Sequence, residues 1–211
     1  MLLEKNANHN YIYVVFVVTN TNMGKLIRLF TRNQYSHVTL AFDKDLNKMY
    51  SFARYRINSP ISGGFVTEQP ERYLSGNNDV TIKICEIPVI EEEYVRIRDE
   101  ITFFDQNKDE MIYNTLNAVL SLLKRRVSVK NTYTCLEFVN YLLRYPNMSA
   151  IRELERRLDE YVVYHGSLKG VAQWEQSYED EDDFFRRRHV MGVIYDTVYH
   201  IRRIVGRLIH N

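Results

Sequence analysis

One segment near the N-terminus constrains the fold more than any other. Residues 11–18 read Tyr-Ile-Tyr-Val-Val-Phe-Val-Val and are followed at once by the polar residues 19–22. β-branched and aromatic residues without a polar interruption are typical of a strand covered on both faces. The run is far too short to cross a membrane. We therefore expect a buried central strand within a sheet.

Several later segments predict partners for this strand. Residues 36–42 and 48–55 flank a polar turn and predict a β-hairpin. Residues 79–89 alternate between apolar and polar side chains and predict another strand, ended by Pro88. A short strand is expected at 161–164. The stretch 58–76 holds prolines and a Gly-Gly pair, which predict a loop.

Helical spacing dominates the second half of the chain. Apolar residues repeat at steps of three and four in one segment, as on the buried face of a helix: Tyr94, Ile97, Ile101 and Phe104. Further helices are expected at 23–30, 111–123, 135–143 and 150–158. The pattern predicts an α+β fold, with an antiparallel sheet packed on helices. We expect one domain over 1–174, followed at 175–211 by an acidic linker and a basic amphipathic helix.

Composition narrows the class of protein. Apolar residues make up 45% of the chain and charged residues 26%, which are globular values. A net charge of +1 argues against a dedicated nucleic-acid binder. The two cysteines lie far apart, and the histidines show no ligand spacing, so neither a disulfide framework nor a metal site is expected. The N-terminus lacks the layout of a signal peptide, so we expect a cytoplasmic, reduced protein with a free thiol and no cofactor.

The pair Cys135 and His37 carries the chemical interest of the sequence. A thiol attacks a carbonyl carbon as the thiolate, which a helix N-terminus and a nearby imidazole favour. Cys135 stands at the start of a predicted helix, after a turn-like segment, and His37 stands at the start of a predicted strand. A lone cysteine on an apolar helix is more often part of the core. The two together suggest a nucleophile and its base, although spacing alone does not bring them together.

Four segments of the chain resemble the permuted NlpC-type cysteine amidases, the YiiX-like branch of the papain-like fold. They are 31–41 (Thr-Arg-Asn-Gln-Tyr-Ser-His-Val-Thr-Leu-Ala), 49–54, 63–66 and 133–139 (Tyr-Thr-Cys-Leu-Glu-Phe-Val). As in that branch, the histidine strand precedes the cysteine helix. The resemblance covers about 11–169 and implies a circularly permuted papain-like fold. It also implies a thiol hydrolase or acyltransferase acting on an amide, isopeptide or ester.

The family pattern includes a third polar residue that holds the imidazole, and its place here is close to Ser51, a weak orienter. Arg54 is either a ligand for a substrate carboxylate or a solvated strand arginine. Tyr133 helps to form the oxyanion hole, lines the pocket or simply packs. Glu137 is expected to be structural, and Cys85 to be inert. The predicted catalytic residues are thus Cys135, His37 and Ser51.

The C-terminal segment forms a basic amphipathic helix over about 184–210. Its apolar stripe repeats at steps of four and three: Val190, Ile194, Val198, Ile201, Val205 and Leu208. Six arginines surround the stripe, with Asp196 as the opposing charge. Such a helix packs on its own domain, pairs with a copy of itself in a homo-oligomer, binds a partner, or lies on an anionic membrane.

Two functions follow from these features. The first is cysteine-dependent hydrolysis or acyl transfer on a small molecule or peptide that carries an amide or ester. The second is a binding or scaffold protein that keeps a papain-like fold with weakened chemistry, and whose C-terminal helix mediates oligomer or membrane association. The weak third residue and the charged tail favour the second.

Overall fold

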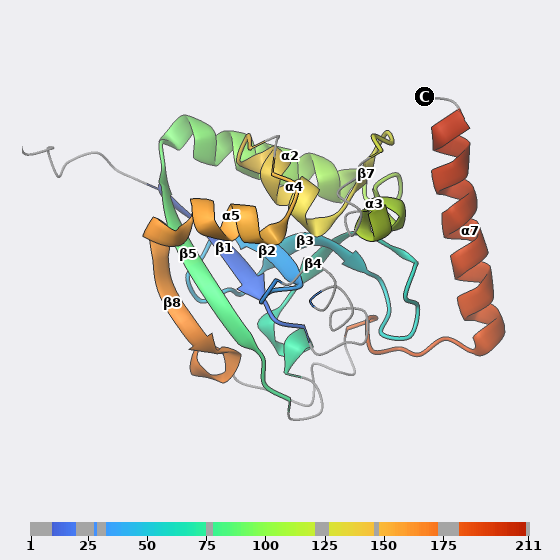
Figure 1. Cartoon of the computed structure of the whole chain (residues 1–211), viewed down its shortest axis with the longest axis horizontal. Coiled ribbons are helices and arrows are strands. Elements are labelled where there is room, and N and C mark those ends of the chain that lie inside the picture. Colours follow the sequence, from blue (N-terminus) through green and yellow to red (C-terminus); the bar gives the residue numbers. More distant parts are fainter. Residues whose placement is uncertain are drawn as a thin grey trace, which may run out of the picture.

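A computed structural model describes residues 10–19, 28, 33–74, 78–120, 127–145, 148–172 and 182–209. Within them an eight-stranded sheet and five α-helices form a mixed α+β fold (Figure 1). The strand order is β7-β6-β4-β3-β2-β1-β5-β8, antiparallel except between β6 and β7. The strands are β1 (Asn10–Val17), β2 (His37–Ala41), β3 (Met49–Arg54), β4 (Gly63–Glu68), β5 (Thr81–Val89), β6 (Ile112–Tyr113), β7 (Thr132–Tyr133) and β8 (Val162–Ser167).

Strand β1 occupies the interior of the sheet, which confirms the expectation from its apolar run. It pairs with β2 on one side and β5 on the other. Its side chains alternate between two hydrophobic clusters. Ile12, Val14 and Phe16 enter the larger cluster, and Tyr13, Val15 and Val17 enter the smaller one on the opposite face. A strand buried on both faces tolerates no polar position, which is why the run is continuous.

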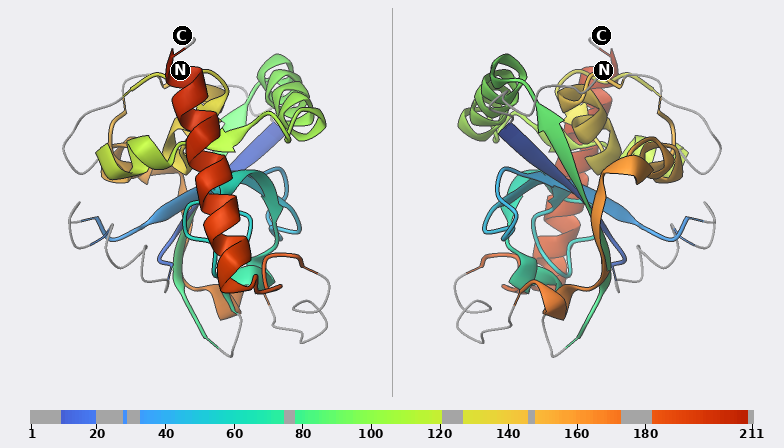
Figure 2. Two further views of the ribbon diagram at one scale, coloured as in Figure 1. Left: turned by 90° about the vertical axis from the view of Figure 1, so that its right-hand side faces the viewer. Right: turned by 90° about the vertical axis from the view of Figure 1, so that its left-hand side faces the viewer.

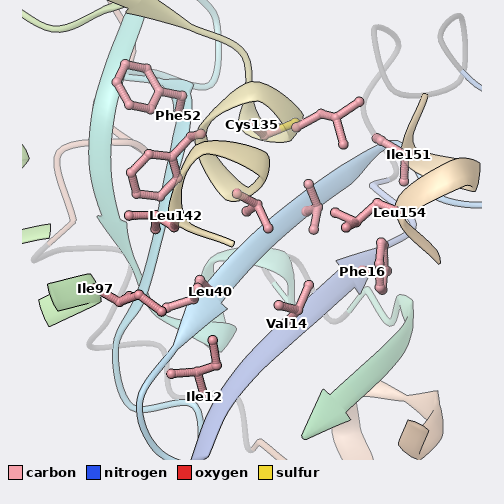
Figure 3. Packing of buried hydrophobic residues seen from close by; sticks show 14 of the residues in the cluster. Ile12, Val14, Phe16, Leu40, Phe52, Ile97, Cys135, Leu142, Ile151 and Leu154 are labelled. Carbon is pink, nitrogen blue, oxygen red and sulfur yellow. The ribbon is translucent and has the colours of Figure 1, made fainter. Parts of the chain in front are cut away.

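The larger cluster lies under helices α2 (Glu91–Gln106), α4 (Cys135–Leu142) and α5 (Ile151–Arg157). Figure 1 shows these helices over one face of the sheet. Figure 3 shows apolar side chains of the helices directed at the strands, among them Ile97, Leu142 and Leu154. Helix α2 contributes Ile97, Ile101 and Phe104, the positions that its spacing predicted. The opposite face is closed by turns and short 3-10 segments, which supply Leu46, Leu74 and Leu168.

Two helices lie outside this layer: the short α3 (Thr115–Leu120) and the long C-terminal α7 (Val190–Ile209). Figure 2 shows α7 running along one side of the molecule, away from the layer of α2 and α5. His200 Nε2 lies 2.9 Å from the carbonyl oxygen of Tyr113. Arg207 donates hydrogen bonds to the carbonyl oxygens of Glu110, Lys130 and Asn131. The helix is thus attached beside strands β6 and β7.

The hairpin β2–β3 and helices α2, α4 and α5 confirm their predictions, whereas the loop predicted at 58–76 was wrong. This stretch contains β4 and the 3-10 helix η1 (Pro70–Tyr73). Gly63 and Gly64 are there because the backbone approaches closely: a Cβ on Gly63 would stand 2.3 Å from the carbonyl oxygen of Ala53. Such an approach inside a strand also calls for glycine, so the Gly-Gly pair did not mark a turn.

Two other boundaries were also wrong. Pro88 does not end β5, which continues to Val89. Strand β8 pairs with β5 only as far as Cys85. Pro88 lacks a backbone N–H, but no hydrogen bond between β5 and β8 is lost, because β8 does not extend to Pro88. Residues 112–113 form strand β6, not the start of a helix. The helix predicted at 23–30, apart from Arg28, lies outside the described residues, as do 121–126 and most of the acidic linker, 175–181.

Candidate active site

Helix α4 begins at Cys135 because a capping box fixes its first turn. The Thr134 hydroxyl accepts a hydrogen bond from the Glu137 amide at 3.2 Å, and the Glu137 carboxylate accepts from the Thr134 amide at 2.8 Å. Asn117 donates a third bond to Glu137, at 2.7 Å. The box leaves the amides of Cys135 and Leu136 without an intrahelical acceptor, and they point out of the helix end. Glu137 is therefore structural, as its position suggested.

His37 and Cys135 meet at this helix end. His37 is the first residue of β2 and is 8% exposed, and Cys135 is 6% exposed. Cys135 lies near the His37 ring, since its negative charge and a side-chain hydrogen bond are among the causes that raise the pKa of His37. His37 Nε2 lies 3.3 Å from Glu68 Oε2, which leaves Nδ1 as the ring nitrogen for the thiol. The two residues singled out in the sequence are thus neighbours in the fold.

The carboxylate behind His37 is Glu68, the last residue of β4. Its side chain is 2% exposed and accepts a hydrogen bond from Ser51 Oγ at 3.0 Å. The Tyr73 hydroxyl also donates to it, and Arg72 Nη1 lies 3.5 Å from Oε1. Burial alone raises the pKa of Glu68, but the charge of His37 and its hydrogen bond, together with Arg72 and Tyr73, lower that pKa to about 2. Glu68 is held as a buried anion.

The same contacts favour the charged form of His37. Burial alone lowers the pKa of His37, but the negative charges of Glu68 and Cys135, with hydrogen bonds to both, raise that pKa to about 10. A cationic imidazole between a carboxylate and a thiol is the arrangement that supports a thiolate. The other cysteine, Cys85, has no such partner among the groups that set its pKa, and burial raises the pKa of its thiol to about 12.

Ser51 contacts the site through Glu68. It lies on β3, fully buried, and donates to the carboxylate. It therefore orients the group that orients His37. The prediction that Ser51 occupies the place of the third residue missed the carboxylate itself, because Glu68 belongs to a strand within the stretch 58–76 that the sequence predicted as a loop. One signal was available in the sequence. Glu68 follows an apolar segment that can form a strand, and such a glutamate can accept a hydrogen bond from a serine on the neighbouring strand, as it does from Ser51.

Arg54 and Tyr133, the two predicted substrate-binding residues, lie in different surroundings. The Arg54 guanidinium donates to the carbonyl oxygen of Ile57 at 3.2 Å and lies near Tyr73 and Tyr113, whose charges affect its pKa. Burial, reinforced by nearby Arg72, lowers the pKa of Arg54. The Tyr133 ring instead packs on Phe52 and Phe104, with centroids at 5.1 and 5.3 Å. Tyr133 lies in the aromatic core.

Two tyrosines that the sequence did not single out, Tyr113 and Tyr73, lie near enough to Cys135 for its charge to affect their pKa values. Burial raises the pKa of Tyr113, and the charge of Cys135 adds to this effect. Burial and Glu68 raise the pKa of Tyr73, and Cys135 contributes again. The Tyr73 and His37 ring centroids are 6.2 Å apart. Arg54 lies near both tyrosines, so the Cys–His pair has polar groups on this side and the hydrophobic cluster that contains Cys135 on the other.

The C-terminal segment closes one side of this region. Phe184 lies with its ring centroid 4.0 Å from the guanidinium carbon of Arg72, and Arg72 Nε is 3.7 Å from Asp182. The backbone of Ile57 donates to Phe184 at 2.8 Å. A cavity of about 490 Å³ borders this contact, lined in part by Arg72, Phe184 and Phe65. Cys135 does not line it.

Among the described residues no three or more His, Cys, Asp or Glu side chains are arranged so that they could hold a metal ion. None of the described helices has the length and hydropathy to span a membrane. Comparison of the chain with family models, with curated proteins and with solved structures finds no match.

Proposed function

We propose that this protein is a cysteine-dependent hydrolase or acyltransferase that acts on an amide or ester. The observation that carries the proposal is the chain of contacts Cys135–His37–Glu68 at the capped start of α4. A nucleophile, a base in contact with it and a carboxylate that orients the base are the three parts of a catalytic triad.

The chemistry assigns one role to each residue. Cys135 gives its proton to His37, and the thiolate forms a bond to the substrate carbonyl carbon. The amides at the start of α4 stabilise the resulting oxyanion. His37 returns the proton to the leaving amine or alcohol as the carbon–nitrogen or carbon–oxygen bond breaks. Water, or a second acceptor in acyl transfer, then releases the acyl group from Cys135.

The position of Arg54 favours a substrate that carries a carboxylate. It is a half-buried guanidinium, near Tyr73 and Tyr113, and both tyrosines are near Cys135. A planar fork of donors matches a carboxylate bidentately. We therefore place the free carboxylate of an acidic acyl or peptide substrate at Arg54.

The circularly permuted NlpC-type papain-like fold is part of the same proposal. Three features support it: a histidine strand before a cysteine helix, a cysteine in the first turn of that helix, and an antiparallel sheet under the helix. The buried carboxylate supplies the third member that this family pattern requires.

The test is acylation of the intact protein by a p-nitrophenyl ester, followed by mass spectrometry. We expect one acyl group on Cys135, turnover with release of the acid, and loss of both in Cys135→Ala. Cys85→Ala is the matched control and should behave as the unmodified chain. His37→Ala should slow the acylation. An adduct spread equally over both cysteines, or no adduct at all, contradicts the proposal.

A binding protein without catalysis is the second candidate, and burial of the site favours it. Cys135 and His37 are both less than a tenth exposed, and Phe184 packs on Arg72, which contacts Glu68. Under this alternative the site recognises a ligand that Cys135 never attacks. Calorimetry with carboxylate-bearing peptides would then show binding in Cys135→Ala and in the unmodified chain alike, with no product formed by either.

A further inference from the structure

Helix α7 is attached to the protein by its polar side. The residues that face the body recur at steps of three and four: Asp196, His200, Arg203 and Arg207. His200 and Ile204 are the buried positions. Arg203 donates to the carbonyl oxygen of Asp109, and Arg207 to three carbonyl oxygens nearby. An amphipathic helix on the surface of a domain ordinarily does the reverse and buries its apolar side.

The apolar side of α7 consequently faces solvent. Met191 is 75% exposed, Tyr195 67%, Val198 43% and Ile209 72%. The other exposed apolar residues of the helix are Val190, Ile194, Tyr199, Ile201 and Val205. The stripe seen in the sequence is therefore present, but it does not pack on the domain. A continuous apolar surface of this kind marks a binding site.

We propose that this outward face of α7 binds the surface of an anionic membrane, with the helix lying in the plane of the headgroups. Asp196, the single acidic residue of α7, lies on the inner side within 3.3 Å of Arg188. The outward row carries a positive charge, Arg202, between Val198 and Val205. Arg187, just before the helix, is also exposed. Apolar side chains with basic residues among them match an anionic lipid surface.

The residue types favour lipid over a second copy of the chain. Tyr195 and Tyr199 stack on each other with centroids 6.2 Å apart, and both are more than half exposed. Tyrosine is enriched at the membrane–water interface, and a long arginine side chain reaches from an apolar face to phosphate. Pairing of two α7 helices would enclose Arg202 of each copy in the seam, without an outward carboxylate to pair with it, at a high desolvation cost.

Co-sedimentation of the full chain with vesicles tests the proposal. We expect binding to phosphatidylcholine vesicles that contain about 30 mol% phosphatidylserine and much weaker binding to pure phosphatidylcholine. The partition coefficient should fall as salt rises from about 0.05 to 0.5 M, because the arginine contribution is screened. The double variant Met191→Glu/Val198→Glu should lower it about 100-fold, since each outward side chain is worth about a factor of ten in burial.

The matched control carries the same charge change elsewhere. Phe103 and Val163 are exposed apolar residues on α2 and β8, so Phe103→Glu/Val163→Glu should bind within about twofold of the unmodified chain. Thermal unfolding verifies that both variants are folded. Cys135→Ala should bind fully, because the proposal does not depend on chemistry at that site. Equal loss in both double variants overturns the proposal, as does a chain that dimerises through α7 and ignores anionic vesicles.

Discussion

Replacing Glu68 with glutamine should change the reactivity of Cys135 without altering the shape of the site. Glutamine keeps the volume of the side chain and still accepts the hydrogen bond from Ser51, but it carries no charge. The charge of Glu68 is the foremost of the interactions that favour a cationic His37. In Glu68→Gln, burial of the imidazole is opposed by Cys135 alone, so the pKa of His37 should fall.

The size of the effect follows from the pKa of His37. One pKa unit corresponds to about 1.4 kcal/mol, so a pKa of about 10 instead of 6.5 stabilises the imidazolium by roughly 5 kcal/mol. Loss of even one third of this energy reduces the ratio of the imidazolium–thiolate pair to the neutral pair about tenfold. We therefore expect the rate of alkylation at Cys135 to drop by up to about tenfold near pH 6.5.

The assay is iodoacetamide labelling from pH 5 to 9, with each cysteine followed by mass spectrometry. Cys85 is an internal reference, because burial raises the pKa of its thiol to about 12 and it should remain unlabelled. Glu86→Gln is the matched control, since the Glu86 carboxylate accepts a hydrogen bond from Tyr13 instead of His37. Identical pH–rate profiles for Glu68→Gln and the unmodified chain would refute the role assigned to Glu68.

Three further outcomes are expected in urea unfolding experiments. Lys83→Met should cost about 2 kcal/mol, because the Lys83 ammonium holds α5 to the sheet through a 2.6 Å contact with Glu155, whereas Lys108→Met on the exposed surface should cost less than about 0.5 kcal/mol. Thr134→Ala should cost about 1 kcal/mol through loss of the cap. The low pKa of Glu68, about 2 against 4.5, stabilises the fold above pH 4.5, and this contribution is lost as pH falls toward 2. The raised pKa of His37, about 10 against 6.5, stabilises the fold below pH 6.5, and this contribution is lost as pH rises toward 10. His37 and Glu68 together therefore stabilise the fold most between pH 4.5 and 6.5.

The sequence predicted those elements whose pattern is set by burial. The run at 11–18 and the spacing of Ile97, Ile101 and Phe104 reflect side chains that enter the core, and both were located within a few residues. It failed where one residue type serves two structural purposes. Gly63 and Gly64 allow close backbone approach inside β4, and the same dipeptide is common in turns.

The candidate site was predicted only in part, because it is assembled by contacts far apart in the sequence. Cys135 and His37 were found from their local settings, a helix start and a strand start. Glu68, by contrast, is 31 positions from His37, and its role depends on the pairing of β3 with β4. Helix α7 shows the same limit, since its apolar periodicity was visible but the direction of its stripe was not.

The order of strands in the sheet has a consequence for how this chain folds during synthesis. Strand β1 is made early, yet it is an interior strand whose two neighbours are β2 and β5. β2 follows after a short interval, but β5 is complete only at Val89, so closing that pairing requires a long loop. Until then one edge of β1 has no partner, and its uncharged, β-branched and aromatic sequence is of the type that pairs with other chains. This topology therefore requires that the free edge of β1 be protected until β5 has been synthesised. The requirement is independent of the stability of the finished fold.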